Sequence, residues 1–244
     1  NYPFIVGKKM EKRIRYYYSF VYEHAKKTIV ICNKAKEWVI EKHQNTIIEV
    51  LYNSVVDDKV VNKKKKDDRI NIVMASSIGT RKGFDILLDA LCRCSNDILK
   101  QFQIHIYGTG DYLDEFKNGC KKNGINNIIF YGRKEMPYKN YSEMDAYLMT
   151  SRSETLPMSI IEAMMCSLPV FSTNVGAIPE MIENGKNGYL YQPDVESIHK
   201  AIEDIVLHKD DLKTLGEESR KIYLNKFSNN SWIKQLEFIL RDNK

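Results

Sequence analysis

Short apolar runs alternate with segments of helical periodicity along most of the chain. The runs are continuously apolar, which is typical of parallel strands that are buried on both faces. Strands that alternate with helices indicate an α/β fold, here a doubly wound parallel sheet. The predicted strands are residues 70–76, 102–108, 127–132, 146–151, 168–173 and 188–191. The predicted helices are residues 84–92, 111–122, 157–166, 178–183, 195–208, 211–224 and 231–241.

The first part of the chain carries too few strands for a doubly wound sheet of its own. Residues 28–32 and 46–52 predict strands, and residues 8–27 and 34–42 predict helices. Because the chain starts at Asn1 and this pattern is incomplete, we expect the remnant of a preceding domain here. The expected division is a domain remnant at residues 1–60, a linker at 61–69, a ligand-binding domain at 70–228 and a closing helix at 229–244.

The composition is that of a soluble globular protein. Hydrophobic residues make up 43% and charged residues 28% of the 244 residues, which excludes collagen-like and disordered chains. No apolar stretch reaches the ~18 residues of a membrane span. The 5 cysteines are odd in number and include no Cys-x-x-Cys pair. A disulfide framework or a zinc knuckle is therefore not expected, and a reducing cytoplasm fits better.

Two basic segments allow more than one interpretation. The lysine run within residues 57–69 suits a nucleic-acid or membrane patch, but acidic residues flank it and no aromatic residue lies within it. We favour a solvated linker and expect no nucleic-acid partner. Tyr16, Tyr17 and Tyr18 stand close to Arg13 and Arg15. This arrangement suits either peripheral binding to a membrane or an ordinary packed helix.

Ligands of doubly wound sheets bind at the carboxyl ends of the strands, near the point where the strand order reverses. Function is therefore expected in the loops that follow the strands, several of which are rich in Gly or Ser. Such loops bring backbone N–H groups and helix N-termini close to an anion, which suits a phosphate. The loops are residues 76–83, 108–110, 132–133, 151–157 and 173–177.

Two glutamates stand out in the loop and helix after residue 151. Between Glu154 and Glu180 the only charged residue is Glu162, which lies in a helix that is apolar nearly all round. Such helices are buried, and a buried carboxylate must find hydrogen-bond donors or shift its pKa. Sugar hydroxyls are suitable donors. Alternatively, Glu154 is a first-turn acid of the helix and Glu162 a locally satisfied core acid.

The Glu-x7-Glu spacing and the sequence EAMMCSLPVFSTNVGAIPEMIENGKNGYLY behind it resemble the retaining GT-B glycosyltransferases called glycosyl transferases group 1, or family 4. The likeness is close over residues 69–191 and looser over residues 28–53. The family's Lys-Gly at the start of a helix is here Lys82-Gly83, and its Gly-x-Gly after the next strand begins at Gly108. Where the family has Asn-Gly before the linker, this chain has Asn53-Ser54. The resemblance implies two Rossmann-like domains, the first of them incomplete here.

The resemblance also implies roles for particular residues. Lys82 resembles the lysine that binds the donor diphosphate, and Glu154 the glutamate beside the transferred sugar, so both are candidate catalytic residues. Glu162 resembles the glutamate that binds the ribose hydroxyls, and Arg133 stands in the loop that lies along the base. The implied nucleotide-binding residues are Ser76, Arg81, Lys82, Gly108, Arg133, Thr155, Leu156, Pro157, Met158 and Glu162.

One departure concerns the diphosphate. The family often carries a Gly-Arg before its Lys-Gly, whose arginine is a second diphosphate ligand, and here that position reads Ala75-Ser76. Either Arg81 substitutes for that arginine, or Lys82 acts with serine and backbone donors alone. Ser76 would then be a neutral donor.

The resemblance implies a metal-independent enzyme without a cofactor. The Asp-Asp pairs at 57–58, 67–68 and 210–211 follow no strand, and the histidines show no ligand spacing. The implied reaction transfers a sugar from a UDP-, GDP- or ADP-sugar to a glycan or lipid-linked acceptor in polysaccharide or glycoconjugate biosynthesis. The expected place is the cytoplasm or the inner face of the membrane.

Two other functions fit the same fold. The first is a non-catalytic module that binds a nucleotide, against which the presence of Lys82, Glu154 and Glu162 speaks. The second is another two-domain enzyme, a phosphorylase or a nucleotide-sugar epimerase. The Glu-x7-Glu spacing argues against an epimerase and leaves a phosphorylase open.

Overall fold

The computed structural model describes residues 20–22, 24–42, 47–58 and 68–241. The chain divides into a larger unit, Asn53–Lys234, and a smaller unit, Asn1–Tyr52 with Gln235–Lys244; each is described by itself. The tyrosines at 16–18 and the lysine run within 59–67 lie outside the described residues. No helix within the described ranges combines the length and the apolar character that a membrane crossing requires.

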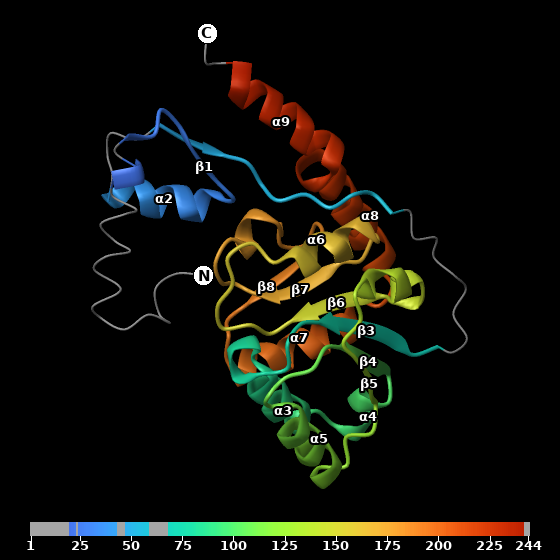
Figure 1. The fold of residues 1–244 in the computed structure, drawn as a ribbon. Helices are drawn as coiled ribbons and strands as arrows, with labels where there is room; N and C mark the ends of the chain where they lie inside the picture. The colour runs from blue at the N-terminus through green and yellow to red at the C-terminus, as the bar shows by residue number, and fades with distance from the viewer. Residues whose placement is uncertain (1–19, 23, 43–46, 59–67, 242–244) are drawn as a thin grey trace. The chain divides into compact units, whose positions relative to one another are not determined.

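A six-stranded parallel sheet forms the centre of the larger unit (Figure 1). Its strands are β3 (Ile70–Ala75), β4 (Phe102–Tyr107), β5 (Ile128–Gly132), β6 (Ala146–Met149), β7 (Val170–Thr173) and β8 (Gly188–Tyr191). Their order in the sheet is β5-β4-β3-β6-β7-β8. Chain order therefore reverses between β3 and β6, which places the switch point of the sheet at the carboxyl ends of these two strands. The predicted parallel sheet is confirmed.

Helices cover both faces of this sheet, as the continuous apolar strands predict. Ile72 and Val73 are neighbours in β3, so their side chains point to opposite faces, and both are fully buried (0%). The helices of the larger unit are α3 (Phe84–Arg93), α4 (Asn96–Leu99), α5 (Leu113–Lys122), α6 (Met158–Met165), α7 (Val195–Leu207) and α8 (Leu212–Ile222). Helix α9 (Asn229–Arg241) begins in the larger unit and ends in the smaller one. Helices α3, α5 and α7 lie on one face and α6 on the other (Figure 1).

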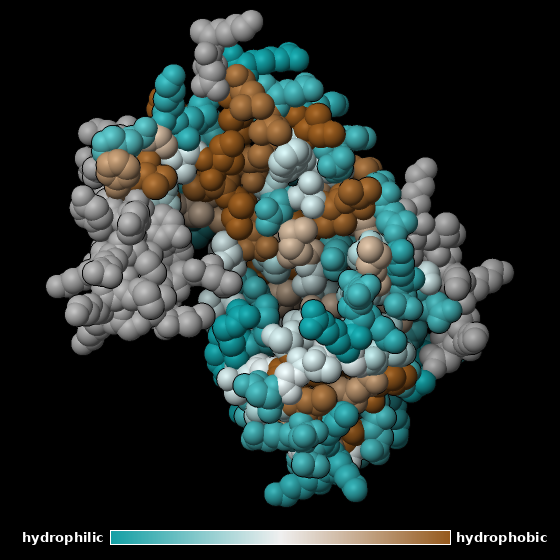
Figure 2. Space-filling view, in the orientation of Figure 1, coloured by the Kyte–Doolittle hydropathy of each residue, from teal (hydrophilic) through white to brown (hydrophobic). Residues whose placement is uncertain are grey.

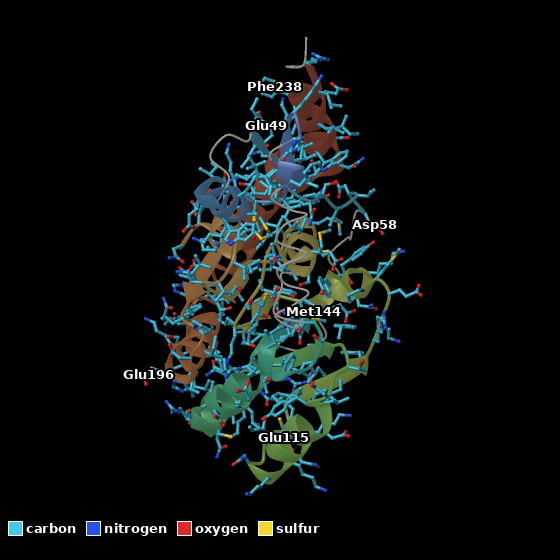
Figure 3. The ribbon with its side chains drawn as sticks, turned by 60° about the vertical axis from the view of Figure 1, so that its left-hand side comes forward. Glu49, Asp58, Glu115, Met144, Glu196 and Phe238 are labelled. Atoms are coloured by element: carbon cyan, nitrogen blue, oxygen red, sulfur yellow. The ribbon has the colours of Figure 1, made fainter. Side chains whose placement is uncertain are left out.

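The helices on the first face share one apolar core with the strands. Phe84 of α3 and Phe116 of α5 meet edge to face, with ring centroids 5.3 Å apart, and Ile202 of α7 belongs to the same core. The opposite sides of these helices are polar. Glu115 on α5 and Glu196 on α7 are exposed and point away from the sheet (Figure 3). Amphipathic helices of this kind are what a doubly wound sheet needs on its surface.

Some short elements depart from the predicted boundaries. A 3₁₀ turn, Thr80–Lys82, precedes α3, and a longer one, Pro137–Glu143, precedes β6. The helix predicted at residues 178–183 is only the 3₁₀ turn Ile178–Glu180. A π-helical segment, Tyr223–Phe227, follows α8. Each is short or begins at a proline, so apolar periodicity gave little signal for it.

Residues 53–58 are tied to the C-terminal part of the larger unit. Arg220 of α8 donates through Nη1 and Nη2 to the two carboxylate oxygens of Asp57 at 2.9 and 2.6 Å, and through Nη1 to the carbonyl oxygen of Met165 at 2.8 Å. The Tyr223 hydroxyl donates to the carbonyl oxygen of Val55 at 2.9 Å. This two-pronged ion pair fixes the start of the larger unit to its last helices.

The smaller unit contains a parallel pair of strands. Strand β1 (Thr28–Val30) pairs with β2 (Ile48–Val50), and α2 (Asn33–Lys42) connects them in the sequence. Both strands confirm the predicted ones, although they are shorter. Helix α9 exposes Phe238 and Leu240, and apolar side chains gather over this helix in Figure 2.

Gly83 determines how the turn before α3 meets the end of β6. Its φ is +73°, in the left-handed region, and a Cβ at this position would lie 1.9 Å from the carbonyl oxygen of Thr150. The Thr150 hydroxyl donates to the carbonyl oxygen of Lys82 at 2.8 Å. A side chain at position 83 would therefore push the turn that carries Lys82 away from β6.

We predict that Gly83→Ala destabilises the protein more than Gly124→Ala. Gly124 has a similar φ of +69°, but a Cβ added there would have no atom within 4 Å, so its substitution should cost only the left-handed backbone, ~1–2 kcal/mol. The clash at Gly83 should add ~1–3 kcal/mol. Urea unfolding of both variants measures the difference. Equal losses would show that the close approach to Thr150 does not matter.

Candidate functional site

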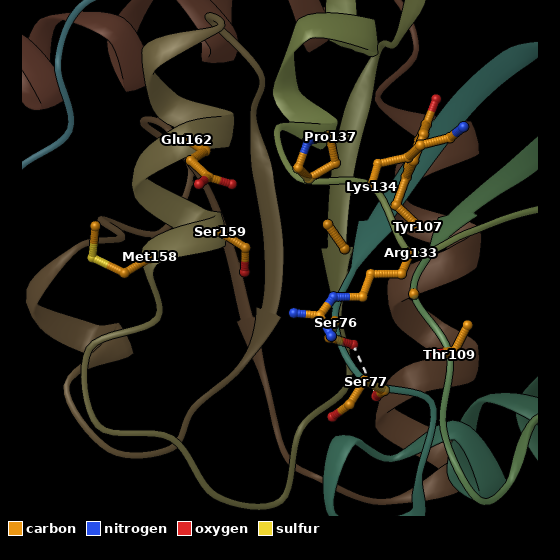
Figure 4. A pocket seen from close by; sticks show the side chains of 12 residues that line it. Ser76, Ser77, Tyr107, Thr109, Arg133, Lys134, Pro137, Met158, Ser159 and Glu162 are labelled. Atoms are coloured by element: carbon orange, nitrogen blue, oxygen red, sulfur yellow. Dashed lines mark hydrogen bonds between the residues drawn. The ribbon is translucent and has the colours of Figure 1, made fainter.

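A cavity of about 410 Å³ opens at the carboxyl ends of β3, β4 and β5, against the start of α6 (Figure 4). It lies beside the switch point of the sheet, in the region where the loops predicted a ligand. Five of the predicted binding residues line it: Ser76, Gly108, Arg133, Met158 and Glu162. The remaining lining residues are Ala75, Ser77, Tyr107, Thr109, Lys134, Pro137 and Ser159.

Glu162 is the acidic group of the cavity. It lies on α6 one turn after Ser159, and its carboxylate faces the cavity (Figure 4). Within the described part of the chain, no group donates a hydrogen bond to this carboxylate, and burial raises the pKa of Glu162 to about 7. A half-buried carboxylate without donors is costly, so the site is chemically suited to a ligand that brings hydroxyl donors.

Basic groups stand on the other side of the cavity. Arg133 and Lys134 follow β5, and Arg133 extends across the cavity toward Ser76 and Ser77 (Figure 4). Among the described residues neither side chain forms an ion pair. With two cations and one carboxylate among its lining residues, the cavity suits an anionic ligand.

An aromatic wall adjoins these basic groups. The ring of Tyr107, at the end of β4, stacks on that of Tyr131 with centroids 4.5 Å apart. Burial raises the pKa of Tyr107 to about 12, so its hydroxyl is neutral at physiological pH. Only 5% of Tyr107 is exposed, so it contributes a small, neutral part of the cavity wall.

Gly108 brings the loops after β3 and β4 together. A Cβ at this position would lie 1.8 Å from the carbonyl oxygen of Ser76, and the Gly108 N–H donates to the carbonyl oxygen of Gly132 at 2.9 Å. Ser76 itself donates through its hydroxyl to the carbonyl oxygen of Ser77 at 3.3 Å. The glycine is thus required by the packing of the cavity wall.

Helix α6 points its N-terminus at the cavity. Pro157 is its N-cap residue and no side chain caps the first turn, so the amides of Met158 and Ser159 have no side-chain acceptor. Uncapped amides at a helix start carry partial positive charge and bind anions. The buried Tyr147 hydroxyl donates to the Ser159 hydroxyl at 2.8 Å, which fixes this part of the wall.

A second cluster lies on the loops after β3 and β6. Lys82 Nζ donates to Glu154 Oε1 at 2.5 Å, and the Ser151 hydroxyl donates to the same oxygen at 2.7 Å. Only 14% of the Lys82 side chain and 9% of the Glu154 side chain are exposed. The two predicted catalytic residues are therefore brought together, although neither lines the cavity.

The other predicted residues also lie outside the lining of the cavity. Arg81 donates through Nη1 to the carbonyl oxygen of Ser153 at 3.1 Å. The carbonyl oxygen of Thr155 accepts from the amide of Ala177 at 2.8 Å, Leu156 is buried and Pro157 occupies the N-cap position of α6 without capping it. These residues shape the loop between Glu154 and α6. Whether Arg81 takes the place of a diphosphate-binding arginine stays a prediction.

Several lining residues were not predicted from the sequence. Ser159 stands three residues before Glu162, a spacing that shares a helix face, and Lys134 adjoins Arg133; both could have been found. Tyr107 looked like one more apolar residue of a strand. In the described part of the chain, no three His, Cys, Asp or Glu side chains gather in a way that could hold a metal ion.

A model of the family "Glycosyl transferases group 1" matches residues 56–222, more than half of the chain. The chain belongs to the glycosyl transferases group 1 family. It is 29% identical over 217 residues to an uncharacterized glycosyltransferase of Methanocaldococcus jannaschii, which covers 88% of this chain and 59% of that protein. It is also 29% identical to the lipopolysaccharide 1,6-galactosyltransferase of Salmonella typhimurium, over 66% of this chain and 45% of that protein. The chain spans about half the length of the curated relatives that it matches.

Solved glycosyltransferase structures share the fold. The Anabaena protein HepE in complex with UDP superposes with a TM-score of 0.82 at 20% identity, over 95% of this chain and 68% of that one. Sucrose-phosphate synthase from Thermosynechococcus elongatus gives a TM-score of 0.80 at 18% identity, over 98% and 64%. These likenesses and the six-stranded sheet confirm the expected GT-B type α/β fold.

We predict that Glu162→Gln stabilises the empty protein in a pH-dependent way. The pKa of Glu162 is raised from 4.5 to about 7 by burial. Between pH 4.5 and 7, Glu162 loses its proton in the unfolded chain but keeps it in the folded protein. The free energy of unfolding of the wild type therefore falls as pH rises from 4.5 to 7. The glutamine variant lacks this loss. Its melting temperature should match that of the wild type near pH 4 and exceed it at pH 8.

The matched control is Glu217→Gln, at an exposed position of α8. Its difference from the wild type should not follow the same pH window. Thermal unfolding from pH 4 to pH 8 measures all three proteins. A Glu162→Gln variant that is less stable than the wild type at pH 8 would show that the folded protein satisfies this carboxylate by itself.

Proposed function

We propose that this chain provides the donor-binding part of a retaining glycosyltransferase that takes its sugar from a nucleoside diphosphate sugar. The observation that carries the proposal is the carboxylate of Glu162, which faces the cavity and accepts no hydrogen bond from any described residue. Two cations without an ion pair among the described residues and a helix start without a side-chain cap border the same cavity. Ribose hydroxyls, a base and a diphosphate together satisfy all of these groups.

The donor takes a definite direction in this proposal. Its ribose hydroxyls donate to Glu162, and its base lies toward Arg133 and the ring of Tyr107. Its diphosphate lies at the start of α6, where the amides of Met158 and Ser159 donate to the phosphate oxygens. The transferred sugar then extends toward the loops that carry Lys82 and Glu154.

Lys82 and Glu154 perform the chemistry in this arrangement. When the bond between the sugar and the diphosphate breaks, its electron pair stays on the departing phosphate oxygen, and Lys82 stabilises the charge that develops there. An ammonium has three N–H donors, so Lys82 can hold Glu154 and a phosphate oxygen together. Glu154 faces the reacting side of the sugar. Retention of the anomeric configuration follows either from attack on the same face or from a double displacement.

Relatives support UDP as the nucleotide and a glycoconjugate as the product. The HepE protein of Anabaena was crystallised in complex with UDP-glucose, and one relative is a lipopolysaccharide 1,6-galactosyltransferase. We therefore propose a UDP-sugar donor and a glycan or lipid-linked acceptor, used in the cytoplasm or at the inner face of the membrane. A module that only holds a nucleotide would have no use for Glu154, which the proposal places beside the transferred sugar.

We predict that UDP raises the melting temperature of this chain more than GDP or ADP does. A ligand at ~100 times its dissociation constant adds ~2.7 kcal/mol to the free energy of unfolding. A thermal-shift panel of UDP, GDP, ADP and their sugars measures the effect. If none of them shifts the melting temperature at millimolar concentration, the donor-site assignment is wrong.

We further predict that the two glutamates can be separated by substitution. Glu162→Gln should weaken the binding of UDP and of a UDP-sugar by the same amount, because a hydrogen bond to a charged group contributes ~1.5–3 kcal/mol. Glu154→Gln keeps one oxygen that can accept from both Lys82 and Ser151, as Glu154 Oε1 does, so it should spare the binding of UDP and weaken only that of the UDP-sugar. Isothermal titration calorimetry of both variants with both ligands tests this. Equal losses on both ligands for Glu154→Gln would exclude its position beside the sugar.

A further inference from the structure

Two loops that are far apart in the sequence are fastened to each other beside the Lys82–Glu154 pair. The amide of Arg152 donates to the carbonyl oxygen of Arg81 at 2.9 Å, and Arg81 donates in return to the carbonyl oxygen of Ser153 at 3.1 Å. These contacts join the turn before α3 to the loop after β6. Lys82 and Glu154 are one residue further along these loops.

The guanidinium of Arg152 makes the strongest of these connections. Its Nη1 and Nη2 donate to the two carboxylate oxygens of Asp85, both at 2.6 Å, and Nη1 also donates to the carbonyl oxygen of Thr80. The hydrogen bond from Arg152 holds the pKa of Asp85 below its usual range, so the carboxylate is ionised at neutral pH. A planar fork of this kind fixes both distance and direction.

The two partners of Arg152 lie on either side of Lys82 in the sequence. Thr80 starts the 3₁₀ turn that Lys82 ends, and Asp85 lies in the first turn of α3. The N-cap residue of the 3₁₀ turn, Gly79, has no side chain that could hold it. Arg152 therefore binds both ends of the segment that carries Lys82. On its own loop, Arg152 stands two residues before Glu154.

We propose that Arg152, held by Asp85, is a positioning residue that keeps the side chains of Lys82 and Glu154 in contact with each other. Neither Arg152 nor Asp85 lines the cavity, so they act through the pair and not on the donor. The part of this inference that concerns binding of the sugar donor rests on the proposed function. The geometry of the pair itself can be measured without any nucleotide.

The first test measures how accessible the amine of Lys82 is. Trace acetylation with acetic anhydride, read by mass spectrometry, should label Lys82 weakly in the wild type, because its side chain is 14% exposed and ion-paired. Labelling of Lys82 should rise several-fold in Arg152→Met and in Asp85→Asn, relative to the exposed Lys100. Arg152→Lys keeps the charge but not the fork and should lie between the wild type and Arg152→Met.

The matched control is Arg220→Met. Arg220 also forms a two-pronged ion pair with an aspartate and donates to a backbone carbonyl, but it belongs to α8, and these partners, Asp57 and Met165, lie outside the two loops. Its loss should lower the melting temperature and leave the labelling of Lys82 unchanged. If the folded Arg152→Met and Asp85→Asn variants label Lys82 as the wild type does, the positioning role is overturned.

The second test is a double-mutant cycle on UDP affinity. If Arg152 acts through Lys82, Arg152→Met should lower the affinity for UDP about tenfold in the wild type. The same substitution should change the affinity little in a Lys82→Met background. Equal losses in both backgrounds would overturn this route of action. Absence of UDP binding by the wild type would instead contradict the proposed function, and the labelling result would still decide whether Arg152 holds the pair.

Discussion

A parallel sheet that is buried on both faces leaves room for polar chemistry only at the ends of its strands. In the larger unit β3 is apolar on both sides, with Ile72 and Val73 fully buried, and helices cover the sheet. The candidate site groups therefore gather at this end of the sheet, on the loops, on the last residue of β4 and on the first two turns of α6. Chain order reverses between the neighbouring strands β3 and β6, and the loops that follow these two strands lie beside each other. The Lys82–Glu154 pair joins these loops, and the cavity lies next to them.

The candidate site carries charge that the empty protein does not fully satisfy. Glu162 is held in an apolar helix with its pKa raised to about 7, while Arg133 and the start of α6 present positive charge to the same cavity. The charged form of Glu162 lowers the stability of the fold, and Arg133 and the start of α6 add no ion pair or cap to it. A ligand that fills the space between them would supply the missing partners. By contrast, Lys82 and Glu154 are already paired at 2.5 Å, and the fork from Arg152 to Asp85 holds the loops on which they stand. In the proposed function, the groups that would bind the donor lack partners in the cavity, whereas the two proposed catalytic residues are already paired.

Much of this arrangement could be predicted from the sequence because it depends on local pattern. Continuous apolar runs marked the strands of the sheet, and a lone charge in an apolar helix marked Glu162. Contacts between distant loops left no such signal: Arg152 and Asp85 are 67 residues apart, and each looks like an ordinary surface residue. For the same reason the sequence did not show that Arg81 turns toward the Ser153 carbonyl, or that Tyr107 ends its strand at the cavity.

A crystal structure of this chain with UDP tests the donor site most directly. The account predicts that the ribose hydroxyls donate to the Glu162 carboxylate, that the diphosphate accepts from the amides at the start of α6, and that Lys82 Nζ reaches a phosphate oxygen. A UDP molecule bound elsewhere on the larger unit, or bound in this cavity with Glu162 still lacking a donor, would contradict it.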